Sequence, residues 1–115
     1  PLIIEEEKMK RAKELCKKFN ECDVRKIDEK KNILEKLFQK KIDVLGIEPN
    51  FYCDYGFNIY LGKNFYSNHN LVILDANRVE FGDNVVIGAG SIVTKDLPSN
   101  VVAVGNQCRF LKKFK

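Results

Sequence analysis

The single histidine of this 115-residue sequence, His69, is its first candidate for acid–base chemistry. Histidine suits general-base catalysis because its unperturbed pKa is about 6.5, so the neutral ring can accept a proton from an attacking hydroxyl group. His69 follows Asn68 at a position that we expect to face outward. A histidine that simply occupies the surface or a subunit interface fits the same position. The residue types leave a catalytic base and a surface histidine as alternatives.

The cysteines are the other reactive side chains: Cys16, Cys22, Cys53 and Cys108. None of them forms a Cys-x-x-Cys pair, and only one histidine accompanies them, so the spacing does not indicate a metal site. None lies in a recognisable nucleophile motif either. We therefore expect free thiols in a reducing cytoplasm, with no structural disulfide and no metal.

A six-residue repeat from Tyr55 to Pro98 must position these side chains. Its hexads are YGFNIY, LGKNFY, SNHNLV and ILDANR, then, after an inserted VE, FGDNVV, IGAGSI and VTKDLP. The first and fifth positions are mostly apolar, the second and fourth are mostly Gly or Asn, and the third should point outward. Gly and Asn tolerate positive φ, which costs other residues about 1–2 kcal/mol, so they indicate corners. Hexapeptide repeats of this kind predict a parallel β-helix.

Two amphipathic helices should precede the repeat, in an amino-terminal region of residues 1–42. Apolar residues recur at helical spacing in 4–20, and a second helix would run to about Lys41, with Asp23 or Asp28 as its cap. Lys40 and Lys41 suit the carboxyl end of its dipole. The repeat region then covers 43–115. Its open end would give the helices a surface to lie on.

Composition and charge limit the possible partners. Hydrophobic residues make up 44% of the chain, which argues against disorder. The net charge is +4, but most of the basic residues precede position 42 and alternate with acids, as on a solvated helix face. No nucleic-acid motif is present, and no apolar run has membrane-spanning length. We expect neither nucleic acid nor a membrane as partner, and a short solenoid with open ends favours a homo-oligomer.

Two segments carry a resemblance to a known family. They are EPNFYCDYGFNIYLGKNFYSNHNLVILD and VVIGAGSIVTKDLPSNVVAVGNQCRFLKK. Both are similar to the maltose and galactoside O-acetyltransferases of the hexapeptide-repeat acyltransferase superfamily. The resemblance implies a mainly β protein with a short left-handed parallel β-helix and two amino-terminal helices, an exception to right-handed crossover connections. It also implies a homotrimer with acetyl-CoA and hydroxyl-acceptor sites between subunits.

The resemblance further implies site residues at matching positions. Those on the acceptor-sugar side are Asp54, Asn68 and Asp75. Those on the coenzyme A side are Ala89, Thr94, Lys95 and Arg109, with Lys112 near the phosphates. The third-position residues among them should face outward, and the small side chain of Ala89 would let a pantetheine arm pass. Alternatively, Asn68 is only a corner residue and the lysines are solubility charges.

One stretch of the family pattern is missing. Relatives carry a middle segment, with a catalytic histidine in a Thr-x-His-Pro-like context, where this sequence joins VEFGDN directly to VVIGAG. The junction falls at GDN (82–84), so the six-residue register continues and a shortened prism is still expected. His69 does not match the family's histidine. Gln107 replaces a common proline, so we expect a looser tail around Arg109. Three interpretations stay open. The chain could be an acetyl-CoA-dependent O-acetyltransferase impaired by the missing segment, or an incomplete version of an active enzyme. It could also be an inactive trimer that binds coenzyme A or serves as a structural module.

Overall fold

Short strands wind into a coil behind two helices in this computed structural model, which describes residues 2–114. The helices are α1 (Leu2–Glu21) and α2 (Ile27–Phe38). The strands are β1 (Val44–Ile47), β2 (Phe51–Cys53), β3 (Ile59–Tyr60), β4 (Phe65–Ser67), β5 (Leu71–Ile73), β6 (Val79–Glu80), β7 (Val85–Ile87), β8 (Ile92–Val93), β9 (Val101–Val104) and β10 (Arg109–Lys113). Neither described helix is both long and apolar enough to cross a bilayer.

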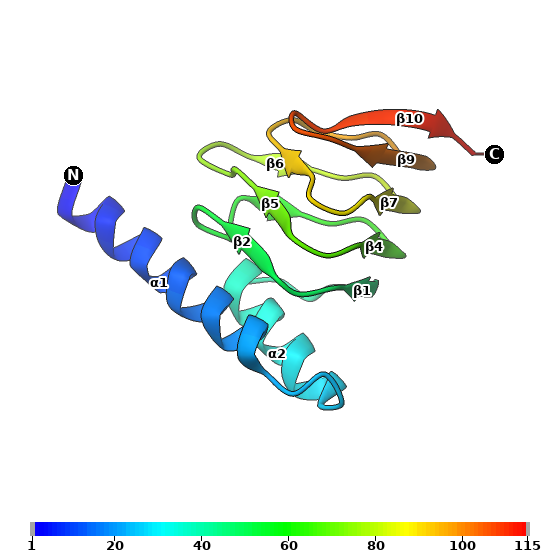
Figure 1. Cartoon of the computed structure of the whole chain (residues 1–115). Helices are drawn as coiled ribbons and strands as arrows, with labels where there is room; N and C mark the ends of the chain where they lie inside the picture. The colour runs from blue at the N-terminus through cyan, green and yellow to red at the C-terminus, as the bar shows by residue number, and fades with distance from the viewer. Residues whose placement is uncertain (1, 115) are drawn as a thin grey trace.

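The strands form the three faces of a prism. Sheet A has the order β1-β4-β7-β9-β10, sheet B has β2-β5-β8, and sheet C has β3-β6. Neighbouring strands that the structure describes are parallel, except that β10 returns antiparallel along β9. Figure 1 shows the coils stacked from β1 to β10. This is a left-handed parallel β-helix of about three turns, as the repeat and the resemblance predicted.

Apolar residues of the hexads and of the strand before them fill the prism. Phe51, Phe65 and Leu71 have no exposed surface, and the Phe65 ring meets the Phe81 ring edge-on at 5.1 Å. The junction at 82–84 leaves this pattern intact, because Phe81 before it is 2% exposed and Val85 after it is 0% exposed. The shortened prism predicted from the continuous register is therefore confirmed.

A ladder of asparagines forms one edge of the prism. Asn64, Asn84 and Asn100 have φ of 60°, 56° and 63°, so the expectation that asparagine marks corners is confirmed here. The Asn64 amide donates to the Asn84 side-chain oxygen at 3.0 Å, and the Asn84 amide donates to that of Asn100 at 2.9 Å. These bonds tie successive coils together at the corner where the sequence is joined.

Three of the four glycines at the second hexad position, Gly62, Gly82 and Gly88, serve a different purpose from the expected one, whereas Gly56 has the expected positive φ of 90°. Gly62 does not have positive φ, but a Cβ there would lie 2.3 Å from the carbonyl oxygen of Gly82 in the next coil. A Cβ on Gly82 would in turn lie 2.3 Å from Ser99 Oγ. At Gly62 and Gly82, glycine is required because the coils approach closely, and not because the backbone turns through the left-handed region.

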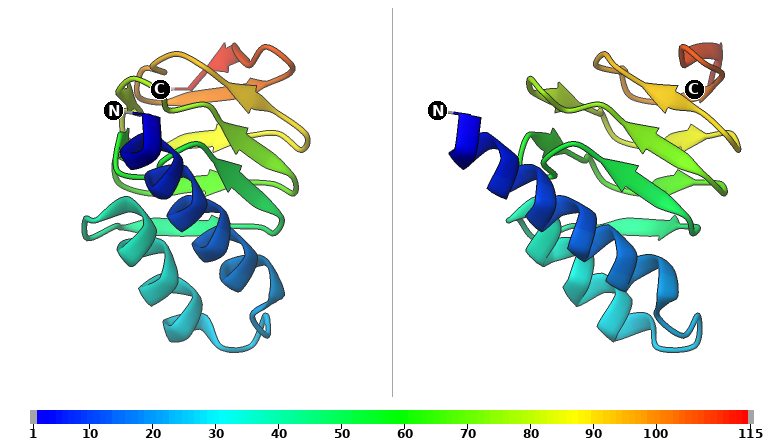
Figure 2. Two further views of the ribbon diagram at one scale, coloured as in Figure 1. Left: turned by 90° about the vertical axis from the view of Figure 1, so that its left-hand side faces the viewer. Right: turned by 60° about the vertical axis from the view of Figure 1, so that its left-hand side comes forward.

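The helices cover the end of the coil that begins with β1 (Figure 2). Phe38 of α2 packs edge-on against Phe51 of β2 at 5.8 Å, and buried residues of both helices join the apolar core of the prism. The helical region 1–42 and the repeat region 43–115 thus share one core. α1 packs against both α2 and β2.

The second helix differs from its prediction at both ends. Its N-cap is Lys26, which makes no side-chain capping bond, and Asp23 instead accepts the N–H of Arg25 at 2.9 Å. The helix ends at Phe38 because Gln39 takes the left-handed conformation with φ 56°. Lys40 lies beyond the helix, where its ammonium group donates to the carbonyl of Phe38 at 3.0 Å. That contact suits the negative end of the helix dipole.

Candidate functional site

Most of the predicted site residues lie along the two borders of sheet B. The corner that precedes this sheet carries Asn68, His69 and Ala89. The corner that follows it carries Asp54, Asp75, Thr94 and Lys95. Hydrogen bonds join the coils at each border: Gly90 N–H donates to the carbonyl of His69 at 2.8 Å, and Leu74 N–H donates to that of Val93 at 2.9 Å. The fold thus brings residues predicted for the acceptor side and residues predicted for the coenzyme side to the borders of one sheet.

Asp75 is buried, so the expectation that it points outward is wrong. It has no exposed surface, and its Oδ1 accepts the amide N–H groups of Asp54 and Tyr55, each at 2.9 Å. Its Oδ2 accepts the N–H of Gly56 at 2.7 Å. Three donors compensate the lost hydration of a buried carboxylate. Asp75 therefore fixes the backbone that presents Asp54.

Asp54 is the more accessible of the two carboxylates. Its side chain is half-buried, and this desolvation raises its pKa, with a second contribution from the negative charge of Asp75. Asp75 bonds only the backbone amide of Asp54, so this contact does not occupy the Asp54 carboxylate.

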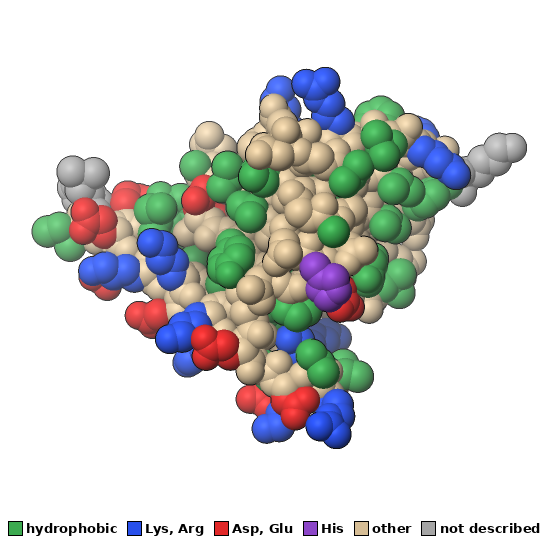
Figure 3. Space-filling model, viewed as in Figure 1, with side chains coloured by type: hydrophobic (Ala, Val, Ile, Leu, Met, Phe, Trp, Pro, Cys, Tyr) green, Lys and Arg blue, Asp and Glu red, His purple; other side chains and the backbone are tan. Residues whose placement is uncertain are grey.

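His69 is exposed and held in one orientation. Its Nδ1 lies 2.7 Å from the carbonyl oxygen of Pro49 in the preceding coil. A carbonyl can only accept, so we assign the ring proton to Nδ1, which leaves Nε2 of the neutral ring as a proton acceptor. The backbone N–H of His69 donates to the side-chain oxygen of the half-buried Asn68 at 2.7 Å. The histidine, purple in Figure 3, lies on the open surface.

The chain after β9 packs back onto sheet B. Gly105 N–H donates to Ser91 Oγ at 3.1 Å, and Cys108 N–H donates to the Ile92 carbonyl at 2.8 Å. The side-chain amide of Gln107 donates to the hydroxyl of Thr94. We expected Gln107 to loosen this segment, and it instead anchors the segment to a predicted site residue. A glutamine in a loop carries no sequence signal for such a contact.

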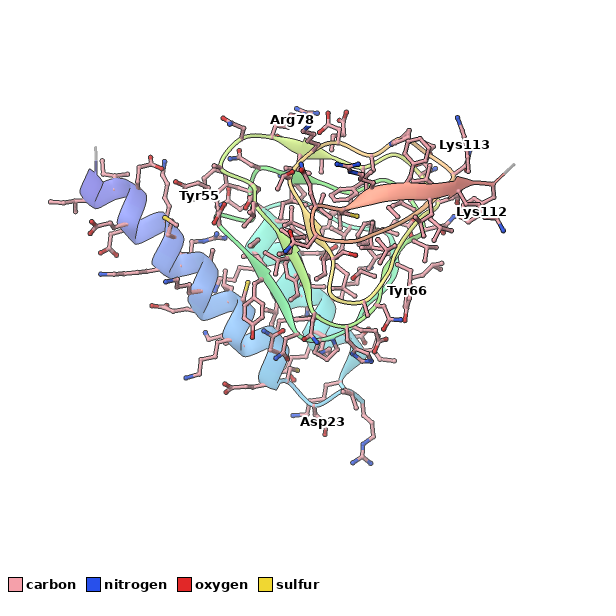
Figure 4. All side chains as sticks on the ribbon, turned by 45° about the horizontal axis from the view of Figure 1, so that its top comes forward. Asp23, Tyr55, Tyr66, Arg78, Lys112 and Lys113 are labelled. Atoms are coloured by element: carbon pink, nitrogen blue, oxygen red, sulfur yellow. The ribbon has the colours of Figure 1, made fainter. Side chains whose placement is uncertain are left out.

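The remaining predicted residues are exposed. Ala89 and Lys95 are exposed at the two borders of sheet B, and Arg109 and Lys112 are exposed on β10, opposite Val104 and Val102 of β9. Figure 4 shows the Lys112 and Lys113 side chains extending away from the coil. Lys115, which the sequence groups with them, lies outside the described residues.

A separate groove of about 710 Å³ runs along the edge of sheet C. Its lining includes Tyr60, Glu80 and Asp96 but none of the predicted site residues. The Arg78 guanidinium lies 3.8 Å from the centre of the Tyr60 ring and bonds Glu80 at 2.7 Å. Across residues 2–114 no three His, Cys, Asp or Glu side chains gather as metal ligands.

Comparison with known proteins identifies the family, although no protein-family model matches the chain. A putative acetyltransferase of Saccharomyces cerevisiae is 34% identical over 140 residues, covering 75% of this chain and 71% of the relative. The galactoside O-acetyltransferase of Escherichia coli is 30% identical over 161 residues, covering 93% of this chain and 79% of the relative. The chain belongs to the hexapeptide-repeat O-acetyltransferases.

A solved structure agrees with this assignment. A galactoside acetyltransferase in complex with coenzyme A superimposes on this O-acetyltransferase chain with a TM-score of 0.61 and 28% sequence identity, covering 96% of this chain and 82% of the other. The alignment with the Escherichia coli relative is longer than the 115 residues of this acetyltransferase. The relative therefore has residues without a counterpart here, in agreement with the loss of a middle segment.

Proposed function

We propose that the protein transfers an acetyl group from acetyl-CoA to a hydroxyl group of a sugar or a similar acceptor. One observation carries the proposal: Asp54, held by Asp75, borders the same sheet as Thr94 and Lys95 of a later coil. Residues of the acceptor side and of the coenzyme side thus share one face. The solved relative with coenzyme A supports the choice of acetyl donor.

The coenzyme would be held by small and basic residues. Ala89 is exposed and carries only a methyl group, so a pantetheine arm can approach the backbone at its corner. Lys95, Arg109 and Lys112 are exposed cations suited to phosphate groups, and charge-assisted hydrogen bonds are about twice as strong as neutral ones. Thr94 contributes a hydroxyl group beside them.

The acceptor would be oriented by the first half of the repeat. The carboxylate of Asp54 can accept a hydrogen bond from a sugar hydroxyl, and Asn68 offers an amide group at the other border of the sheet. Asp75 would not contact the acceptor itself, because its two oxygens accept the backbone N–H groups of residues 54–56. It is a positioning residue in this scheme.

His69 is the base that we propose for this shortened chain. Acetyl-CoA supplies an activated thioester. Nε2 of His69 would take the proton of the acceptor hydroxyl as its oxygen bonds to the carbonyl carbon. The imidazolium would then return the proton to the leaving sulfur as the carbon–sulfur bond breaks. The Pro49 carbonyl, 2.7 Å from Nδ1, would stabilise the charged ring during this step.

The proposed enzyme is a homotrimer and is located in the cytoplasm. Large apolar side chains remain exposed on the single chain: Ile3 is 76% exposed, Ile4 54%, Tyr52 49% and Leu74 42%. Burial between copies would remove this surface from water. All four cysteines are free thiols, which suits a reducing compartment.

The test is an assay of thiol release from acetyl-CoA with a panel of sugars, paired with calorimetric titration of coenzyme A. Acceptor-dependent release above the buffer rate is the expected result. Failure to release thiol and to bind coenzyme A would overturn the proposal.

An inactive coenzyme A-binding trimer is the second candidate function. It is favoured by the length of the Escherichia coli alignment, which shows that residues of that relative are absent from this chain. Binding of coenzyme A without turnover on any acceptor would select this candidate. Molecular mass from light scattering tests the trimer independently of both functions.

A further inference from the structure

Two cysteines that are far apart in the sequence meet where α1 crosses the first coil. Cys16 lies on α1 and Cys53 ends β2, and their sulfur atoms are 3.9 Å apart. Cys16 is 2% exposed, and Cys53 is half-buried. Packing of the helix on the strand fixes this pairing, since α1 and β2 make direct contact. The spacing of the four cysteines does not indicate this pair rather than any other.

We propose that Cys16 and Cys53 form a reversible disulfide when the protein meets hydrogen peroxide, so that α1 becomes covalently tied to the first coil. A disulfide has a sulfur–sulfur length of about 2.05 Å, so the two atoms must approach by roughly 2 Å. Side-chain rotation and a small shift of the helix supply such a movement. This inference does not depend on the acetyltransferase proposal.

The oxidation balances with peroxide alone. One thiolate attacks a peroxide oxygen, the oxygen–oxygen bond breaks, and the products are a sulfenic acid and a hydroxide ion that becomes water. The second thiolate attacks that sulfur and the sulfur–oxygen bond breaks. The hydroxide that leaves takes up the remaining proton and becomes the second water. The two thiols lose two electrons in total, and peroxide is reduced to two waters. A dithiol such as dithiothreitol reverses the reaction by thiol–disulfide exchange.

Proximity makes this pair react differently from the other thiols. The contact between the two thiols lowers the pKa of Cys16 and raises that of Cys53, and burial adds to the rise at Cys53. Thiolates are the reactive species, so oxidation should accelerate as the pH increases above neutrality. Cys22 and Cys108 are also free thiols, and in the unsubstituted protein they serve as internal controls.

The experiment compares intact mass before and after peroxide. In the Cys22→Ser/Cys108→Ser variant, peroxide should lower the mass by about 2 Da, give a peptide linking residues 16 and 53, and raise the melting temperature by roughly 5–10 °C. Dithiothreitol should reverse all three changes. Adding Cys53→Ala should abolish them. If the double variant does not fold, peptide mapping of the unsubstituted protein gives the same information.

Three outcomes would overturn the inference. Both thiols could remain open to alkylation under denaturing conditions after peroxide treatment. The mass could rise by added oxygen without the linked peptide. The linked peptide could join Cys16 or Cys53 to another cysteine or to a second copy of the chain.

Discussion

Asp75 lies against the backbone of Asp54, 21 residues earlier in the chain, and accepts its amide N–H at 2.9 Å. The same carboxylate accepts the next two backbone N–H groups, so one buried side chain fixes the turn between β2 and β3. Gly56 closes this turn at φ +90°, where a Cβ would meet the Leu37 carbonyl oxygen at 2.5 Å. The turn that presents Asp54 is therefore held by Asp75 on one side and packed against the Leu37 carbonyl on the other.

Replacing Asp75 tests this role directly. Asp75→Ala removes the acceptor of three N–H groups, and we expect the free energy of unfolding to fall by about 3 kcal/mol, because unsatisfied buried donors cost about 1–3 kcal/mol each. Asp75→Asn keeps one oxygen acceptor and should lose less. Urea denaturation followed by circular dichroism measures both. An unchanged midpoint in Asp75→Ala would mean that the three bonds do not stabilise the turn.

Asp54 should make stability depend on pH. Desolvation raises its pKa in the folded state, so the folded protein binds this proton more tightly than the unfolded chain does. This contribution is complete below the unfolded pKa of about 3.9 and is lost as pH rises through the higher folded pKa. Asp54→Asn should therefore flatten the stability curve in the acid range just above the unfolded pKa of about 3.9, measured by urea midpoints. Identical curves for the two proteins would contradict the raised pKa.

The six-residue period was enough to predict the β-helix, because inward apolar positions and asparagine corners are local consequences of residue type. The period also showed that the junction at 82–84 would not interrupt the core, and Asn84 in its ladder agrees. The orientation of Asp75 was not predictable in this way. It depends on three N–H groups of an earlier coil, and no local pattern reports them.

Contacts between coils explain the other differences. Gly62 resembles a corner glycine in the sequence, but its requirement comes from a carbonyl one coil away. Replacing proline by Gln107 suggested a more flexible tail, but the Gln107 side-chain amide donates to the hydroxyl of Thr94. The cap of α2 was misplaced for a different reason: Asp23 bonds the adjacent turn, so it does not reach the helix.

Gly88→Val tests close approach between coils. Our sequence-based expectation was a strained corner, but Gly88 does not have positive φ, and a Cβ there would lie 2.6 Å from Cγ2 of Val104. We expect a loss of about 3 kcal/mol, typical of overpacking. The matched control is Gly90→Ala, where φ is +72° but nothing lies within 4 Å of the added Cβ. It should lose only about 1 kcal/mol through backbone strain. Equal losses would contradict the steric explanation.

Lys95→Glu tests the proposed coenzyme side. The lysine is exposed, so its replacement should leave folding and molecular mass unchanged. Coenzyme A should bind about tenfold more weakly, because a charge-assisted hydrogen bond contributes about 1.5–3 kcal/mol. Calorimetric titration measures the affinity. Lys63→Glu, at another exposed corner, is the control for net charge and should keep the affinity. If both variants bind equally well, Lys95 does not contact the coenzyme.

His69→Asn separates the orientation of the ring from its basicity. The asparagine amide can still donate to the Pro49 carbonyl, as Nδ1 now does at 2.7 Å, but it has no counterpart of the basic Nε2. We expect kcat to fall by about 10²–10⁴, with the acceptor KM and the melting temperature unchanged. Asn70→Gly is the control, because its φ of 65° is one that glycine adopts without strain. Full activity in His69→Asn would show that proton transfer from the acceptor does not pass through this histidine.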